Sequence, residues 1–282
     1  KKRQEVLEKC YQRTETMKKL VREKDRLTEQ IARIKTEIKE DLQVIFPEIE
    51  SLTDIFSEGI LDLLSRTSTP IGIKSLREKT IEKILNNKKG RSLKVSIEEI
   101  RARAANSNGF NEENLSFNLT MKIKQLRFFQ EQVNEYQKKI DDWFEDKMKM
   151  EMEILLSIPG VGKITAQKFL IEIESIDHFE NYKQLIAFIG TDPMLKQSGS
   201  SIDYHGRISK KGHRRLRKTL WQMAVGSIHW SEKYHNYYNK KRSEGKAYKQ
   251  AIIAVANKLL KLIFVLLSKK ELYCQKQDSQ AA

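Results

Sequence analysis

The most informative segment of the chain reads Leu155-Leu156-Ser157-Ile158-Pro159-Gly160-Val161-Gly162-Lys163-Ile164-Thr165-Ala166. An apolar helix end is followed by a Pro-Gly-Val-Gly turn and then by a second helix. Glycines permit backbone angles closed to other residues, and the free amides that begin a helix favour a bound phosphate. The segment therefore predicts a helix-hairpin-helix that binds DNA phosphates through Gly160, Val161, Gly162 and Lys163. An ordinary tight turn between two helices is the alternative interpretation.

The charge of the whole chain also favours a polyanionic partner. Lysine and arginine number 53 against 38 acidic residues, which gives a net charge of +15. Such a basic balance is typical of proteins that bind nucleic acid, although a solvated lysine-rich face is the simpler explanation. Cys10 and Cys274 are the two cysteines of the sequence, which predicts no disulfide framework and suits a reducing cytoplasm. Residues 251–267 are apolar but carry Asn257, Lys258 and Lys261, so we expect a buried helix and no membrane partner.

Two long helices are predicted upstream of this segment. Apolar residues in residues 1–46 alternate at three and four positions, as in a coiled coil, and Pro47 ends the pattern. Residues 119–144 repeat it, so we predict an antiparallel arm, or a contact between copies that would make a homo-oligomer. Residues 48–117 form a small helical cap, in which Ser96 and Glu99 indicate a helix start. The predicted fold is mainly α, with the arm and cap in residues 1–149 and a C-terminal domain in residues 150–282.

A basic run follows in the C-terminal domain. A helix over residues 182–188 ends at Gly190, and a polar loop follows over residues 196–201. Seven basic side chains then lie between Arg207 and Lys218 with no acidic residue among them. Like charges at this density repel each other unless something neutralises them, which favours bound phosphates. The predicted phosphate-binding residues of this run are Arg207, Lys210, Lys211, His213, Arg214, Arg215 and Arg217.

Ser198 in the polar loop is a candidate nucleophile, because neighbouring cations and loop amides could stabilise a transition state. A Ser-Gly-Ser-Ser loop taken alone is more often a flexible linker. Glu172, Glu174 and Asp177 are close in sequence, but we interpret them as a solvated helix face. No metal site is predicted in this chain.

The order of several motifs carries a family likeness over about residues 150–270. The shared elements are Ile158-Pro159-Gly160-Val161-Gly162, Phe179, Leu185-Ile186-Ala187-Phe188-Ile189-Gly190, Pro193, Gln197-Ser198-Gly199, Arg207, Lys210, Gly212, Leu216-Arg217, Ala224, Tyr237-Tyr238, Arg242, Gly245-Lys246 and the stretch from Ala251 to Leu260. This part resembles the C-terminal domain of the DEDD transposases of insertion sequences, the IS110 and IS1111 group that includes the pilin-gene inverting recombinase.

The resemblance implies a DNA transposase or site-specific recombinase in which Ser198 is the nucleophile of strand exchange. His213 or a nearby cation would activate it. The family joins this domain to an N-terminal RuvC-like nuclease domain that holds Mg²⁺ through four acidic residues, and the chain begins at Lys1 where that domain would have ended. The resemblance further implies a structured guide RNA, a site shared between protomers and a cytoplasmic, nucleoid-associated location in bacteria. A non-catalytic helix-hairpin-helix module on a coiled-coil arm is the alternative, and a purely structural rod is a third interpretation.

Overall fold

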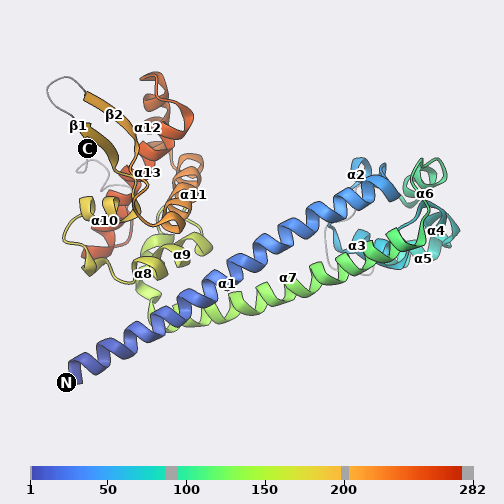
Figure 1. The fold of residues 1–282 in the computed structure, drawn as a ribbon, viewed down its shortest axis with the longest axis horizontal. Helices are drawn as coiled ribbons and strands as arrows, with labels where there is room; N and C mark the ends of the chain where they lie inside the picture. Colours follow the sequence, from blue (N-terminus) through green and yellow to red (C-terminus); the bar gives the residue numbers. More distant parts are fainter. Residues whose placement is uncertain (1, 87–94, 198–202, 275–282) are drawn as a thin grey trace. The chain divides into compact units, whose positions relative to one another are not determined.

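The computed structural model describes residues 2–86, 95–197 and 203–274, and most of them are helical (Figure 1). The prediction of a mainly α protein is confirmed. The chain divides into two compact units. One unit comprises residues 22–138, and the other comprises residues 1–21 together with residues 139–282.

An antiparallel helix pair forms one side of the unit of residues 22–138. It consists of the parts of α1 (Lys2–Ile45) and α7 (Glu113–Lys147) that lie in this unit. Lys24 of α1 donates a hydrogen bond to Gln137 of α7. Asp41 of α1 forms an ion pair with Lys122 of α7 at 2.8 Å. Because early residues of α1 meet late residues of α7, the two helices run in opposite directions. The alternating apolar residues thus pair within one chain, and their pairing between copies stays a prediction.

Short helices complete this unit. They are α2 (Ile49–Leu52), α3 (Glu58–Arg66), α4 (Pro70–Ser75), α5 (Glu78–Asn86) and α6 (Ile97–Ala105). The predicted helix start is confirmed, because the Ser96 hydroxyl accepts a hydrogen bond from the Glu99 amide at 3.1 Å. Thr69 caps α4 in the same way, with Pro70 at the first helical position. The side chains that fill the core between these helices and the long pair include Ile38, Leu42, Ile60, Leu64 and Ile123.

Helix α13 (Tyr248–Lys269) lies at the centre of the other unit. It packs against α8 (Lys149–Leu156), α10 (Tyr182–Ile189), α11 (Arg214–Trp230) and α12 (Glu232–Ser243). Its inward side chains Val255, Leu259 and Ile263 are fully buried, as predicted for this apolar segment. In the described part of the chain α13 is the one helix long and apolar enough to cross a membrane, and 50% of its most apolar window is buried. Met17 and Val21 of α1 join the same core, together with side chains of α9 (Lys163–Ile173).

A two-stranded hairpin was not expected from the sequence. β1 (Pro193–Gln197) and β2 (Asp203–Ile208) are antiparallel, with Gln197 opposite Asp203 and Leu195 opposite His205 (Figure 1). The predicted polar loop is therefore wrong for residues 196 and 197, which belong to a strand. The polar composition of this segment hid the strand, because strand formation depends on a partner that lies elsewhere in the sequence. Residues 198–202, which include Ser198, lie outside the described residues.

Candidate nucleic-acid interface

The predicted helix-hairpin-helix turn connects α8 to α9. Gly160 adopts a φ of +86°, in the left-handed region that glycine occupies at no steric cost. A Cβ atom at this position would lie 2.3 Å from the carbonyl carbon of Gly226 on α11, so the two backbones are in direct contact. Val161 is buried in the core. Gly160 and Val161 thus fasten the turn to α11, which is a structural role that the phosphate-binding interpretation did not include.

The start of α9 is the exposed part of this turn. Gly162 caps the helix with an ordinary φ of −89°, and a Cβ atom there would meet nothing closer than 3.9 Å. Lys163 is 54% exposed, and its Nζ atom lies 2.8 Å from a carboxylate oxygen of Asp141 on α7. The other carboxylate oxygen of Asp141 accepts a hydrogen bond from Gln167 at 2.7 Å. A phosphate at this helix start would meet free amides and one lysine that is already paired with a carboxylate.

The basic run supplies a group of exposed cations around the start of α11. We call Lys210, Lys211, Arg214 and Arg215 the basic group, and all four side chains are exposed. Arg214 and Arg215 occupy the first turn of α11, where no acidic residue balances them. Cations are destabilising at a helix N-terminus because of the helix dipole. Their accumulation at this end does not stabilise the helix and agrees with the predicted phosphate-binding role, which stays a prediction.

Arg217 does not belong to this exposed group. It is half-buried, and its Nη1 atom donates hydrogen bonds to the carbonyl oxygens of Ile189 at 2.9 Å and Gly212 at 2.7 Å. Gly190 and Gly212 approach so closely that a Cβ atom at Gly190 would lie 2.6 Å from the Gly212 amide nitrogen. The guanidinium therefore ties the end of α10 to the loop before α11. The side chain of Arg207 lies in the part of the hairpin whose side chains are not described.

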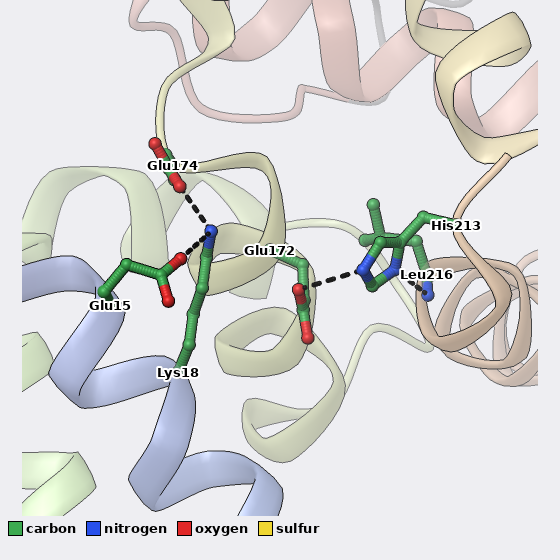
Figure 2. A network of polar contacts seen from close by, with 6 residues as sticks. All are labelled: Glu15, Lys18, Glu172, Glu174, His213 and Leu216. Carbon is green, nitrogen blue, oxygen red and sulfur yellow. Dashed lines mark hydrogen bonds and ion pairs between the residues drawn. The ribbon is translucent and has the colours of Figure 1, made fainter. Parts of the chain in front are cut away.

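His213 connects α11 to α9. Its Nδ1 atom accepts a hydrogen bond from the Leu216 amide at 3.3 Å and so caps α11, while its Nε2 atom lies 3.3 Å from a carboxylate oxygen of Glu172 (Figure 2). An accepting Nδ1 requires the proton on Nε2, which then donates to Glu172. Both ring nitrogens of His213 are engaged in these contacts. The ring thus positions α11, and the proposed role as activator of Ser198 would require it to leave them.

The interpretation of Glu172, Glu174 and Asp177 as a solvated face is wrong for Glu172. Glu172 is only 9% exposed. Glu174 forms an ion pair with Lys18 of α1 (Figure 2). Burial alone would lower the pKa of Lys18, but its hydrogen bonds to Glu174 and Glu15 and their charges outweigh burial and raise that pKa above its usual value. The two glutamates therefore hold neighbouring elements onto the end of α9.

We predict that the stability contributed by the His213 cap can be measured separately from the stability contributed by the contact between His213 and Glu172. His213→Ala should lower the free energy of unfolding by about 1–3 kcal/mol, because it removes both interactions. His213→Asn should recover part of this loss, since asparagine is a good N-cap but cannot reach Glu172 as the ring does. Urea unfolding at fixed pH measures both. Equal destabilisation by alanine and asparagine would contradict the capping role.

The base of the β-hairpin is fastened beside the basic group. Ser209 donates to the Asp192 carboxylate at 2.6 Å, and its amide donates to the Asp192 carbonyl at 2.9 Å. Thr191 donates to the side chain of Asn257 on α13 at 2.7 Å. The amide of Lys210 then donates to the Gly190 carbonyl at 3.3 Å. The strand that leads directly to Ser198 in the sequence and the loop that carries the basic group thus begin from one junction.

The structure does not bring all the predicted phosphate-binding residues together. Gly226, which touches the turn at Gly160, is twelve residues after Arg214 on α11. At a rise of about 1.5 Å per residue, this spacing places the turn about 18 Å along the helix from the basic group. Glu172 and His213 meet at the opposite end of α9 from Lys163. The turn and the basic group are therefore two separate candidate contacts.

A metal site needs several ligating side chains close together. No group of three or more His, Cys, Asp or Glu residues that could hold a metal ion occurs among the described residues. The Mg²⁺ that the family resemblance implies therefore has no ligand set among the described side chains.

Sequence reasoning missed several residues that position this site. Nothing in the sequence indicated that Asp192 positions the site, and Asn257 was marked only as a polar residue of the apolar segment; their contacts lie 17 and 66 residues away in the sequence. Glycine at position 226 was an available signal, because an isolated glycine inside a helix usually has a packing reason.

Known proteins similar to this chain include transposases and related proteins of insertion sequences. Residues 152–239 match the model of the transposase family IS116/IS110/IS902, which confirms the predicted resemblance in this region.

Individual relatives agree with the family model. The chain is 32% identical over 115 residues to the pilin gene-inverting protein of Moraxella bovis, covering 40% of this chain and 36% of that protein. It is 33% identical over 130 residues to the transposase for insertion sequence element IS1111A of Coxiella burnetii, covering 45% and 35%. A longer match, 24% identical over 229 residues, relates 80% of the chain to 57% of an insertion element IS900 protein of Mycobacterium paratuberculosis. The chain spans between 28% and 60% of the length of the relatives it matches.

Proposed function

We propose that this chain is the DNA-engaging part of an insertion-sequence transposase or recombinase, with Ser198 as the nucleophile of strand exchange. One observation carries the proposal. The strand that leads to Ser198 and the loop bearing the basic group are fastened to the same junction at Asp192, Ser209 and Gly190. A nucleophile for DNA must be held next to cations that hold the phosphates around the attacked bond.

The basic group would bind the DNA backbone at this junction. Arg214 and Arg215 lie in the first turn of α11, where the free backbone amides and the helix dipole would favour the same phosphate that the guanidinium groups bind. The start of α9 at Gly162 and Lys163 would contact a second stretch of backbone. The half-buried Arg217 and the ring of His213 would support these contacts from behind rather than touch phosphate.

The family resemblance also implies a structured guide RNA, so we extend the proposal to RNA as a second ligand. The same phosphate chemistry would serve RNA, and the net charge of +15 leaves ample basic surface for it. A partner subunit and a metal-bearing nuclease domain, both implied by the family resemblance, would complete the active assembly.

Salt dependence of binding tests the DNA-engaging role. Contact with about six phosphates would lower duplex affinity by about a thousandfold between about 50 and 200 mM salt. Arg214→Gln with Arg215→Gln should reduce the magnitude of the log–log salt slope by about two. Lys269→Gln with Lys270→Gln is the matched control, because it removes equal charge from exposed residues at the end of α13.

Fluorescence anisotropy with a labelled duplex, and separately with a structured RNA, gives the salt dependence of the affinity for each ligand. A flat slope for the unmodified chain would mean that the basic group is only a solvated face. A slope that falls equally in both double variants would show that overall charge, not this junction, drives binding.

A further inference from the structure

An exposed aromatic side chain lies beside the basic group. Phe188 is in the last turn of α10 and is 42% exposed. Its ring centre lies 6.3 Å from that of His213, with an angle of 16° between the ring planes, and 5.3 Å from that of Phe179 at 60°. The Phe188 ring is thus supported on two sides by other rings, while much of it remains open to solvent.

The support under Phe188 is rigid. Its carbonyl oxygen accepts a hydrogen bond from the His213 amide at 3.0 Å, and a Cβ atom at Gly212 would lie 2.2 Å from the same oxygen. The ring of His213 is in turn fixed by Leu216 and Glu172, as Figure 2 shows. A platform held in this way loses little conformational freedom when a ligand covers it.

The charges around Phe188 select the ligand. Lys210, Lys211 and Arg214 directly flank the Gly212-His213 pair that touches Phe188, and all three are exposed. A single exposed phenylalanine is ordinary on a protein surface. An aromatic ring flanked by cations is instead the combination by which proteins bind unpaired nucleotides, where a base stacks on the ring and phosphates meet the cations.

We propose that Phe188 is a stacking platform for a nucleobase that is not paired in a duplex. This inference rests on the proposed function and deepens it, because it names a single-stranded or unpaired segment as the nucleic acid bound at the base of the hairpin. A base inside a duplex has both faces covered by its neighbours and cannot reach the ring. Discrimination between single strand and duplex therefore depends on Phe188, whereas phosphate binding by the basic group serves both.

The test compares single-stranded DNA with a duplex of the same sequence. Phe188→Leu retains an apolar side chain but lacks the aromatic face, and should weaken single-strand binding by about tenfold while duplex binding changes less than about twofold. Phe188→Tyr should restore single-strand affinity. Trp230→Leu is the matched control and should change neither affinity, because Trp230 is 73% exposed at the other end of α11. Quenching of a 2-aminopurine base in the single strand, which stacking produces, should disappear in Phe188→Leu alone.

Two results would overturn the inference. The first is an unchanged single-strand affinity and unchanged quenching in Phe188→Leu. The second is an equal loss of affinity for both ligands in the leucine and tyrosine variants. Thermal unfolding of each variant verifies that the fold is kept. Failure of the unmodified chain to bind either ligand would instead contradict the proposed function itself, so the two failures are distinguishable.

Discussion

Ser198→Ala is expected to reduce strand exchange by about a thousandfold or more while leaving DNA affinity within about twofold of the unmodified protein. The reason is that the hydroxyl would form a bond only during the reaction, whereas the basic group and the start of α9 would supply the binding energy. Removing an interaction made only in the reaction lowers the rate without weakening the bound state. The measurement is recombination of a two-site plasmid by the full-length protein, together with DNA binding by anisotropy.

Ser201→Ala is the matched control for this prediction, because Ser201 belongs to the same serine-rich segment of the sequence. It should retain strand exchange. Comparable loss of binding and exchange in Ser198→Ala would contradict the nucleophile role and favour the non-catalytic binding module. Equal loss of exchange in both alanine variants would show that the segment matters for its conformation and not for one hydroxyl.

Gly160→Ala is expected to destabilise the unit that contains it by about 3 kcal/mol or more. Two costs add. An alanine at a φ of +86° costs about 1–2 kcal/mol, and its Cβ atom would lie 2.3 Å from the backbone of Gly226, which forces α9 and α11 apart. Urea or thermal unfolding followed by circular dichroism measures the change in the free energy of unfolding.

Gly245→Ala isolates the first of these costs. Gly245 has a similar φ of +81° but has no atom within 4 Å of the position a Cβ would take. Gly245→Ala should lower the free energy of unfolding by only about 1–2 kcal/mol, which is the cost of an alanine in the left-handed region. Equal destabilisation at the two positions would mean that the contact between Gly160 and Gly226 contributes nothing to stability.

The contact between Gly160 and Gly226 also changes what the Pro-Gly-Val-Gly turn means. A glycine in such a turn was interpreted as room for a phosphate, but Gly160 is occupied by packing against α11. Of the two glycines in this turn, Gly162 is the one with open space beside it. The local pattern of residues is the same in both cases, so the sequence of the turn alone does not distinguish a ligand-binding glycine from a packing glycine.

The sequence by itself determined the features that depend on nearby residues. The alternating apolar residues and Pro47 predicted the long first helix, Ser96 predicted the start of α6, and Gly190 predicted the end of α10. Each of these signals acts over one or two helical turns, through backbone angles, capping hydrogen bonds or a repeated apolar face. The family likeness likewise rested on short motifs in a fixed order.

Only the tertiary structure decided which of the predicted residues face a ligand. It buried Glu172 against His213, turned Arg217 inward to two carbonyl oxygens and separated the turn at Gly160 from the basic group by most of the length of α11. It also placed Phe188 beside cations that are more than twenty residues later in the chain. The physical reason is that burial, ion pairing and stacking depend on partners brought together by packing of distant helices, and no local periodicity encodes that arrangement.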